Sequence, residues 1–319
     1  MRALRFDQTL VYQPQNPEPS PAEGDTLIAI TTAGICSTDL EICKGYMGFA
    51  GILGHEFVGV VLESPAPELV GRRVCGEINI VCGTCSLCRS GLSNHCTNRS
   101  VLGILKHPGA FAERVRLPAA NLHLVPDSVD DEQAVFVEPL AAAFQILSQV
   151  PITPQTTITI LGDGRLGLLV AQVLRNTGAP VCLVGRHPKK LALCEKWSIQ
   201  TQLFSEALPG HDQDVVVDCT GSAAGFELAM GMVRPRGTVV LKSTVAIGKA
   251  MNLAPLVIDE ITVVGSRCGP FPEAIRALES RRVDVASLIH HRMPLEQGVQ
   301  AMALTTSPGV LKVLLTVRD

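Results

Sequence analysis

The chain lacks a large excess of either charge, an apolar segment long enough to cross a membrane, and an apolar leader at its start. Its formal net charge of −3 gives no electrostatic basis for binding nucleic acid or an anionic membrane. The first residues, MRALRFDQTLVYQPQ, contain no apolar region of the kind found in secretory signals. We therefore expect a cytoplasmic protein whose 11 cysteines stay reduced or bind metal.

The length and texture of the chain predict two domains. The 319 residues are 46% hydrophobic, and domains average about 150 residues. The N-terminal part consists of short apolar runs between glycine, proline and polar turns, as at Thr26–Thr32, Phe57–Leu62 and Arg72–Cys75. Such a pattern favours a β-rich, barrel-like domain.

From about Pro151 the pattern changes to apolar strands that alternate with helices, as in Thr157–Leu161 followed by Arg165–Asn176. This alternation is typical of a parallel α/β sheet that is buried on both faces. After Ser287 the strand-like texture returns, in a tail too short to form a domain alone. We predict a catalytic domain of residues 1–145 that is completed by residues 288–319, and a dinucleotide-binding domain of residues 146–287.

Four cysteines stand at C-x2-C-x2-C-x7-C spacing in the polar segment CGTCSLCRSGLSNHC: Cys82, Cys85, Cys88 and Cys96. Four thiolates so close in sequence can converge on one tetrahedral Zn²⁺ with no vacant coordination position. The alternative interpretations are unrelated cysteines or two disulfides. The spacing predicts a structural zinc lobe that performs no chemistry.

The segment GDGRLG matches the dinucleotide fingerprint G-x-G-x-x-G at Gly162, Gly164 and Gly167, with Arg165 and Leu166 between the last two glycines. It follows the apolar strand TITIL and opens a helix, which is the context that the motif requires. Its glycines permit close approach of a pyrophosphate to the free N–H groups of the helix. The alternative is a structural turn between strand and helix.

The end of the second strand of this domain bears on which dinucleotide binds. Enzymes that use NAD place a carboxylate there for the ribose hydroxyls, whereas this chain has Gly185 and Arg186, with Lys190 following. Glycine leaves room for a 2′-phosphate, and arginine can bind that phosphate with several donors. We therefore expect NADP(H) rather than NAD(H), the alternative being a solvated basic helix start. We also assign Thr220 and Ser266 to the cofactor site.

Several residue types that suit a catalytic zinc occur in separate motifs. GICSTD and GHEFVG lie in the N-terminal domain, and VFVEPLAAA lies near the predicted domain junction. Cysteine, histidine and carboxylate can hold Zn²⁺ while leaving one position open for water or substrate. Singly, each residue has an ordinary structural interpretation. The candidate residues are Cys36, Thr38, Asp39, His55, Glu56 and Glu138.

These motifs carry a resemblance that spans nearly the whole chain. GICSTD, GHEFVG, the four-cysteine lobe, EPLA, ILGDGRLG and VVGSRCG resemble the zinc-dependent medium-chain dehydrogenases of the alcohol/polyol dehydrogenase superfamily. EPL and CSTDLEI are closer to the sorbitol and glucose dehydrogenases than to the ethanol dehydrogenases. The resemblance implies a GroES-like catalytic β-barrel domain, a doubly wound Rossmann domain and an active site in the cleft between them.

The resemblance also implies roles for individual residues. Cys36 and His55 would ligate the catalytic zinc, and a glutamate would be the third protein ligand. We favour Glu138 as that ligand, with Glu56 close by and able to replace it or to bind through water. Thr38 would carry the hydroxyl that relays the substrate proton. Asp39 would orient His55 and fix its tautomer.

One departure from the resemblance concerns the proton path. Many relatives have a histidine three residues beyond the relay hydroxyl, where this chain has Glu41, so the exit of the proton is left open. Lys106 and His107 follow the lobe and either bind substrate hydroxyls or are ordinary solvated turn residues. Both interpretations stay open at this point.

The sequence thus predicts an oxidoreductase with two Zn²⁺ per chain, one catalytic and one structural. It would transfer hydride between NADP and a secondary alcohol of a sugar, polyol or cyclitol, with a small alcohol or carbonyl compound as its partner. The alternatives are a biosynthetic dehydrogenase with a dedicated larger substrate, and a non-catalytic dinucleotide-binding sensor. The resemblance further implies a homodimer or homotetramer.

Overall fold

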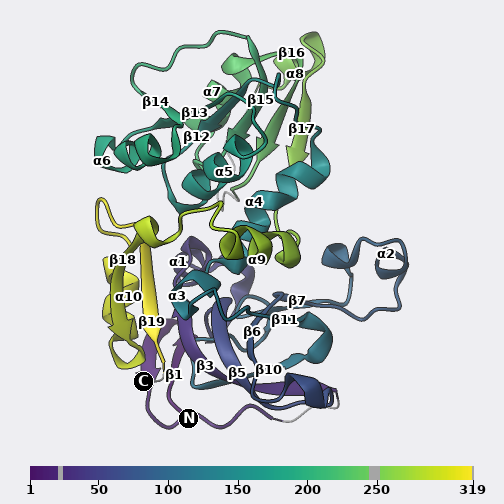
Figure 1. Cartoon of the computed structure of the whole chain (residues 1–319), viewed down its shortest axis with the longest axis vertical. Coiled ribbons are helices and arrows are strands. Elements are labelled where there is room, and N and C mark those ends of the chain that lie inside the picture. The colour runs from purple at the N-terminus through teal and green to yellow at the C-terminus, as the bar shows by residue number, and fades with distance from the viewer. Residues whose placement is uncertain (21–23, 244–251, 318–319) are drawn as a thin grey trace. The chain divides into compact units, whose positions relative to one another are not determined.

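The computed structural model describes residues 1–20, 24–243 and 252–317 and divides into two compact units (Figure 1). Unit 1 contains Met1–Glu138, Ala274–Ser280 and the described part of Leu288–Asp319. Unit 2 contains Pro139–Glu273 and Arg281–Ser287. The C-terminal segment therefore returns to the unit formed by the N-terminal part of the chain.

Unit 1 is built around a seven-stranded sheet with the order β11-β6-β5-β3-β19-β18, in which β10 also pairs with β3. Strand β3 is long because it has two partners on one side, β10 along its first half and β19 along its second half. The bounds are β3 (Asp25–Gly34), β5 (Glu56–Glu63), β6 (Arg73–Gly76), β10 (Arg114–Pro118), β11 (Leu122–Leu124), β18 (Ile289–Pro294) and β19 (Lys312–Thr316). The tail is thus an integral part of this sheet.

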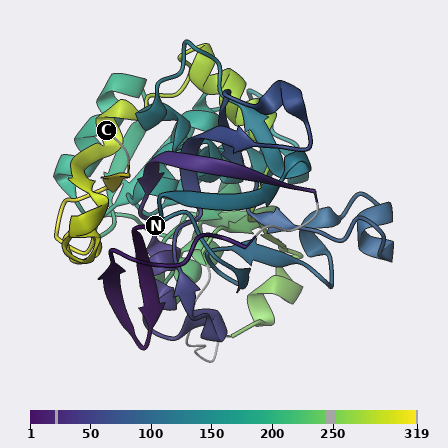
Figure 2. The same ribbon diagram turned by 90° about the horizontal axis from the view of Figure 1, so that it is seen from below.

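Two smaller sheets complete unit 1, with the orders β2-β1-β4 and β7-β8-β9. Their strands are β1 (Ala3–Asp7), β2 (Thr9–Gln13), β4 (Gly51–Ile52), β7 (Asn79–Ile80), β8 (Ser100–Leu102) and β9 (Lys106–His107). Between β7 and β8 the chain forms the four-cysteine lobe, which contains the short helix α2 (Ser86–Arg89). In both Figure 1 and Figure 2 this lobe projects from the rest of unit 1.

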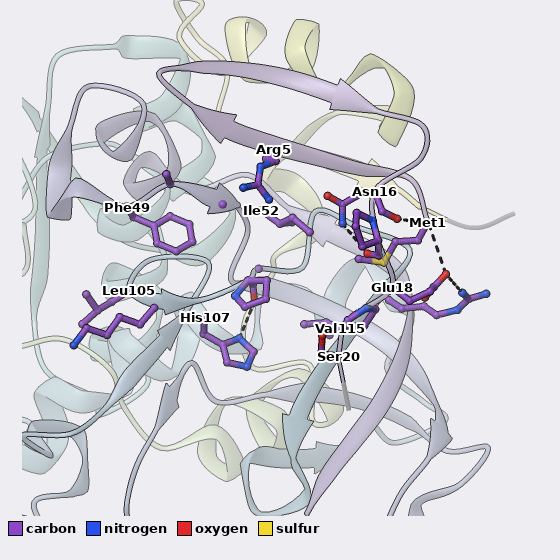
Figure 3. A pocket seen from close by; sticks show the side chains of 18 of the residues that line it. Met1, Arg5, Asn16, Glu18, Ser20, Phe49, Ile52, Leu105, His107 and Val115 are labelled. Atoms are coloured by element: carbon purple, nitrogen blue, oxygen red, sulfur yellow. Dashed lines mark hydrogen bonds and ion pairs between the residues drawn. The ribbon is translucent and has the colours of Figure 1, made fainter. Parts of the chain in front are cut away.

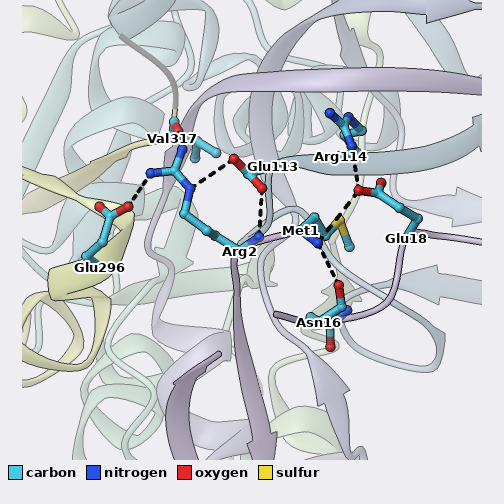
Figure 4. Close-up of polar contacts among 8 residues, drawn as sticks. All are labelled: Met1, Arg2, Asn16, Glu18, Glu113, Arg114, Glu296 and Val317. Atoms are coloured by element: carbon cyan, nitrogen blue, oxygen red, sulfur yellow. Dashed lines mark hydrogen bonds and ion pairs between the residues drawn. The ribbon is translucent and has the colours of Figure 1, made fainter. Parts of the chain in front are cut away.

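A cluster of charged side chains holds the N-terminus against the C-terminal segment (Figure 4). The Arg2 guanidinium binds the Glu113 carboxylate at 2.9 Å, forms an ion pair with Glu296, and donates to the carbonyl of Val317 at 3.2 Å. The Arg2 backbone N–H also donates to Glu113 at 2.7 Å. These contacts join residues about as far apart in the sequence as the chain allows, so they reinforce the pairing of the tail with unit 1.

Unit 2 is a six-stranded parallel sheet with the order β14-β13-β12-β15-β16-β17. This is the doubly wound order, in which the strands turn back at the first strand of the fold. The bounds are β12 (Ile158–Leu161), β13 (Val181–Gly185), β14 (Gln200–Leu203), β15 (Gln213–Asp218), β16 (Val233–Leu241) and β17 (Thr262–Gly265). All four residues of β12 are buried, as expected for a central strand covered on both faces.

The helices are short except for two that contain many buried alanine, leucine and valine residues, α4 (Val137–Gln149) and α5 (Arg165–Arg175). The others are α1 (Ser37–Ile42), α3 (Asp131–Ala134), α6 (Pro188–Leu191), α7 (Ala223–Met232), α8 (Ala254–Ile258), α9 (Phe271–Glu279) and α10 (Gly298–Leu304). Within the described residues, no helix is long and apolar enough to cross a membrane. The predicted fold class, a β domain with a parallel α/β domain, is confirmed.

Candidate metal and nucleotide sites

Three residues from separate positions of unit 1 bring possible metal ligands together. Cys36 precedes α1, and His55 and Glu56 stand at the start of β5. Their ligand atoms all lie within 4.8 Å of one another. His55 and Glu56 are only 3% and 2% exposed. A thiolate, an imidazole and a carboxylate are donors that Zn²⁺ binds in catalytic sites, so the residues present fit this metal.

Asp39 organises this group through contacts with its backbone and with His55. One oxygen of the fully buried Asp39 carboxylate accepts a hydrogen bond from the Cys36 N–H at 2.8 Å. The other oxygen lies 3.3 Å from both the Gly54 N–H nitrogen and Nδ1 of His55. Within the described part of the chain, Nδ1 of His55 has no well-aligned hydrogen-bond partner, so its attraction to Asp39 is mainly electrostatic. Asp39 therefore lies where it can orient His55.

The charges around His55 favour a cation at this position. Burial lowers the pKa of His55, but the nearby negative charges of Asp39 and Cys36 outweigh burial, so that the pKa lies well above its usual value. An environment that stabilises a proton on the imidazole also stabilises a metal cation beside it. The electrostatics of the group thus agree with its donor set.

Thr38, Glu138 and Glu41, all named from the sequence, lie at different places in unit 1. The Thr38 hydroxyl oxygen is 3.7 Å from the Cys36 sulfur, so Thr38 borders the group. Glu138 lies in the first turn of α4 and is not a member of the three-residue group found among the described residues. Its role as a metal ligand stays a prediction. Glu41 forms a surface ion pair with Lys44 at 2.8 Å.

Sequence reasoning missed Lys312, the first residue of β19. Its side chain is 1% exposed and forms an ion pair with Glu56. Burial lowers the pKa of Lys312 to about 8, although the negative charges of Cys36 and Asp39 raise it. The only signal in the sequence is a lysine inside the apolar run VLKVLLTV, and only the fold shows which residue it meets.

The four cysteines of the lobe converge as predicted from their spacing. The distance between sulfur atoms is 3.5 Å for Cys85 and Cys88, 3.5 Å for Cys82 and Cys96, and 3.8 Å for Cys85 and Cys96. A disulfide requires about 2.05 Å. Sulfurs about 2.3 Å from one tetrahedral zinc lie roughly 3.8 Å apart. The geometry therefore matches a shared metal and excludes disulfides between these sulfurs.

The glycine-rich turn of unit 2 connects β12 to α5 as the fingerprint requires. A Cβ atom at Gly167 would lie 1.9 Å from the carbonyl oxygen of Gly162, so only glycine permits this close packing of turn and helix. Arg165 and Leu166 lie in the first turn of α5, and the backbone N–H groups at a helix N-terminus attract phosphate. Gly164 precedes them and has open space around it.

The turn after β13 is fixed by a carboxylate from the first glycine-rich turn. The buried Asp163 accepts hydrogen bonds from the backbone N–H groups of Arg186 and His187 at 2.8 and 2.6 Å. A Cβ atom at Gly185 would lie 2.6 Å from the Asp163 side chain. The Arg186 guanidinium stacks over the ring of Phe204 at 4.7 Å. No acidic side chain can therefore occupy position 185 without a rearrangement.

The remaining predicted cofactor residues lie at the ends of other strands of unit 2. The Thr220 hydroxyl donates to Asp218 at 2.7 Å just after β15. Ser266 follows β17 and accepts from the Lys242 ammonium at 3.2 Å. Lys190 lies on α6. Ligands of open α/β sheets bind at the carboxyl ends of the strands, where Thr220 and Ser266 are found.

A cavity of about 840 Å³ lies elsewhere in unit 1 (Figure 3). Arg5, Phe49, Ile52 and the loop with Lys106 and His107 line it, and the described residues of its wall do not include the metal-binding group. Nδ1 of His107 is 2.8 Å from the Pro108 carbonyl oxygen, and burial lowers the pKa of His107. Lys106 is exposed to solvent. These two residues thus border a separate cavity.

Comparison with known proteins matches both parts of the chain to dehydrogenase families. Residues 22–127 match the alcohol dehydrogenase GroES-like domain, and residues 166–281 match the zinc-binding dehydrogenase family. The chain is 30% identical to the sorbitol dehydrogenase of Halalkalibacterium halodurans over 96% of this chain and 95% of the relative. It is 31% identical to the D-altritol 5-dehydrogenase of Agrobacterium fabrum over 91% of each chain.

Solved structures have the same fold. A Sinorhizobium meliloti protein described as a zinc-binding dehydrogenase and bound to NADP has a TM-score of 0.90, with 28% identity and coverage of 99% of both chains. The alcohol dehydrogenase TADH from Thermus sp. ATN1 has a TM-score of 0.88, with 28% identity and complete coverage of both chains. Unit 1 is thus a GroES-like domain and unit 2 a Rossmann domain. The chain belongs to the zinc-dependent medium-chain alcohol/polyol dehydrogenase superfamily.

Proposed function

We propose that this enzyme uses zinc to transfer hydride between NADP and a secondary alcohol of a sugar, polyol or cyclitol. The observation that carries the proposal is the group of half-buried Cys36 and buried His55 and Glu56, whose ligand atoms lie within 4.8 Å of one another. This donor set suits a zinc that keeps one position exchangeable. The membership of the chain in a dehydrogenase family supplies the class of reaction.

Each residue of the group has a task that follows from its chemistry. When bound, Zn²⁺ acts as a Lewis acid that lowers the pKa of an alcohol. Thr38 relays the substrate proton: its hydroxyl oxygen, 3.7 Å from the Cys36 sulfur, accepts that proton while its own hydroxyl proton passes on to water. Asp39 holds His55 in one orientation, so that the ring nitrogen away from Asp39 is the ligand atom. Cys36 is held by its own backbone bond to Asp39.

The preference for NADP over NAD rests on the turn after β13. Gly185 lies against Asp163 and leaves no space for the carboxylate that NAD enzymes place there. The carboxylate of Asp163 already accepts two backbone hydrogen bonds from the turn. Arg186, stacked on Phe204, is pre-ordered to bind a 2′-phosphate, because stacking reduces the rotamer freedom that binding would otherwise remove.

The substrate class rests on the relatives and on the acid at Glu138. Sorbitol dehydrogenase and D-altritol 5-dehydrogenase, two relatives of the chain, are named for polyols.

We further propose a second, structural Zn²⁺ in the four-cysteine lobe, because its sulfurs lie 3.5–3.8 Å apart. Four thiolates leave that ion no open position for chemistry.

We also propose that the enzyme forms a homo-oligomer through the edge of unit 2. Strand β17 is the last strand of the six-stranded sheet. Immediately before it in the chain, Val257 and Ile258 of α8 are 79% and 75% exposed. Exposed apolar side chains beside an unpaired strand edge are typical of an interface between subunits. Light scattering of the purified protein should give at least twice the mass of one chain.

The experiment that tests the proposed function is a spectrophotometric assay of zinc-loaded protein with NADP⁺ or NAD⁺ and a panel of sugars, polyols and cyclitols. We expect absorbance of the reduced cofactor to appear with NADP⁺ and to be lost after chelation of the metal. Turnover that survives complete removal of zinc would contradict the proposal. No turnover with any member of the panel would favour a dedicated larger substrate or a binding protein without turnover.

The cofactor preference has its own test in the variant Arg186→Gln. Loss of the guanidinium should raise the KM for NADP⁺ by roughly tenfold to a hundredfold, the range of one charge-assisted contact. The KM for NAD⁺ should change little because NAD⁺ lacks the 2′-phosphate. Equal changes for both cofactors would mean that Arg186 does not recognise the phosphate.

A further inference from the structure

Lys312 reaches Glu56 across an intervening strand. In the sheet of unit 1, β3 lies between β5, which carries Glu56, and β19, which begins with Lys312. Gly34 of β3 pairs with Glu56 on one side and with Leu314 on the other. A Cβ atom at position 34 would lie 2.6 Å from the Lys312 ammonium and 2.7 Å from a Glu56 oxygen. The absence of a side chain at Gly34 is therefore what lets the two charges meet.

The ammonium of Lys312 is fully enclosed by groups that suit a cation. Besides the ion pair with Glu56, Nζ lies 3.4 Å from the carbonyl oxygen of Ile35 and 5.4 Å from the centre of the Phe136 ring. Lys312 and Glu56 are 1% and 2% exposed. Removing one partner of such a buried pair leaves an uncompensated charge, which is strongly unfavourable. Each of the two residues thus depends on the other to compensate its buried charge.

The same carboxylate is also a member of the metal-binding group with Cys36 and His55. Two cations, the ammonium of Lys312 and a bound metal, would therefore compete for Glu56. Without the lysine, the metal would be the remaining cation beside this buried carboxylate. Whether Glu56 binds the metal then depends on its ion pair with Lys312.

We propose that Lys312 is a positioning residue that restrains Glu56 from becoming a permanent metal ligand and so keeps one coordination position exchangeable. This inference rests on the proposed function, because it requires a metal at Cys36 and His55 whose third protein ligand is Glu138, as the resemblance implies, with Glu56 as the competing carboxylate. The inference has a specific consequence: replacing Lys312 should change the coordination of the metal only while position 56 carries a carboxylate. A lysine that merely fills the core would matter equally with or without that charge.

The test uses the full-length enzyme loaded with Co²⁺, whose visible absorption reports coordination, and azide as the probe of an exchangeable position. Difference spectra during azide titration isolate the proposed catalytic site, because a four-thiolate site has no vacant position. In Lys312→Met, Glu56 is released to the metal, and half-saturation should require roughly tenfold more azide, at the lower end of the range for residues that support metal ligands. An unchanged titration would overturn the proposal.

A second pair of proteins keeps the test valid where Lys312→Met folds poorly. Glu56→Gln and Glu56→Gln/Lys312→Met should give the same azide titration, because the amide has no charge for the lysine to hold. A difference between these two proteins would mean that Lys312 acts by another route and would overturn the proposal. Lys242→Met, which replaces a mostly buried lysine of unit 2, is the matched control and should leave the spectrum unchanged.

The same titration separates this inference from the proposed function. If the wild-type protein binds Co²⁺ only in the four-cysteine lobe and shows no azide-dependent spectrum, the metal site itself is wrong. If the wild type responds to azide and Lys312→Met responds identically, the metal site stands and the role of Lys312 is wrong. Gly34→Ala supplies an independent variant, because its Cβ atom would push Lys312 and Glu56 apart. It should shift the titration in the same direction as Lys312→Met.

Discussion

The two cysteine-containing sites of unit 1 differ in how the chain assembles them. The four-cysteine lobe uses residues within one short segment, Cys82 to Cys96, and most of its cysteines are partly or fully exposed. The group around Cys36 draws on the start of α1, the start of β5 and the ion pair from β19, and its histidine and glutamate are buried. A site made from one segment can hold structure by itself, whereas a site made from three depends on the whole sheet.

The two sites also differ in their electrostatics. In the lobe, backbone hydrogen bonds from Thr84 and Cys85 lower the pKa of Cys82 to about 5, which favours the thiolate form that a metal binds. Around Cys36, the ammonium of Lys312 offsets part of the negative charge of Cys36, Asp39 and Glu56. We infer that the lobe is arranged for a permanent metal, and the buried group for a metal with an exchangeable position.

The largest expected effect comes from removing the thiolate of the buried group. Cys36→Ser should reduce kcat/KM by at least about a thousandfold, since a lost metal removes several kcal/mol of transition-state stabilisation. The zinc content, measured by elemental analysis, should fall by one equivalent while the lobe keeps its own. A variant with full activity would show that Cys36 does not hold the catalytic metal.

The corresponding change in the lobe should affect stability rather than chemistry. Cys88→Ser should also lose one equivalent of zinc and lower the Tm, because binding energy of a structural metal contributes directly to folding. The kcat of the folded fraction should stay within a factor of about two, as expected for sites without shared partners. Thermal unfolding and assay of the same sample check this, and a loss of kcat as large as that of Cys36→Ser would remove the contrast between the sites.

An intermediate effect is expected from the residue that orients His55. Asp39→Asn keeps the size of the side chain but removes the charge that lies 3.3 Å from Nδ1. Metal affinity at the buried group should fall by roughly tenfold to a hundredfold, measured by competition with a chromogenic chelator. The affinity of the lobe serves as the internal reference in the same protein. A uniform loss at both sites would indicate general unfolding instead.

The mildest perturbation, a change of pH alone, concerns protons released by the lobe. Loss of hydration and hydrogen bonding with the neighbouring sulfurs of Cys85 and Cys96 raise the pKa of Cys88 to about 12, so this thiol is protonated at neutral pH and must lose its proton when metal binds. The apparent affinity of the lobe should therefore rise with pH between 6 and 8, by roughly tenfold per unit for each proton released. Calorimetry in buffers of different ionisation enthalpy measures the number of protons released when metal binds. Affinity independent of pH would mean that the thiols are ionised beforehand.

The sequence by itself determined the features that depend on neighbouring residues. The spacing of Cys82, Cys85, Cys88 and Cys96 predicts a shared tetrahedral metal, and the sulfur distances agree with it. The alternation of strands and helices after Pro151 predicts the parallel sheet, which is confirmed. Local spacing and periodicity suffice here because each element is specified by residues close to one another.

Only the tertiary structure decided how distant residues meet. It brought Cys36 beside His55 and Glu56, as the resemblance implied, and showed that Lys312, from the far end of the chain, forms an ion pair with that glutamate. It also showed that Asp163 closes the turn at Gly185. The physical reason is strand pairing: the register of β5, β3 and β19 puts Gly34 between the two charges, and no pattern local to any one strand encodes that register.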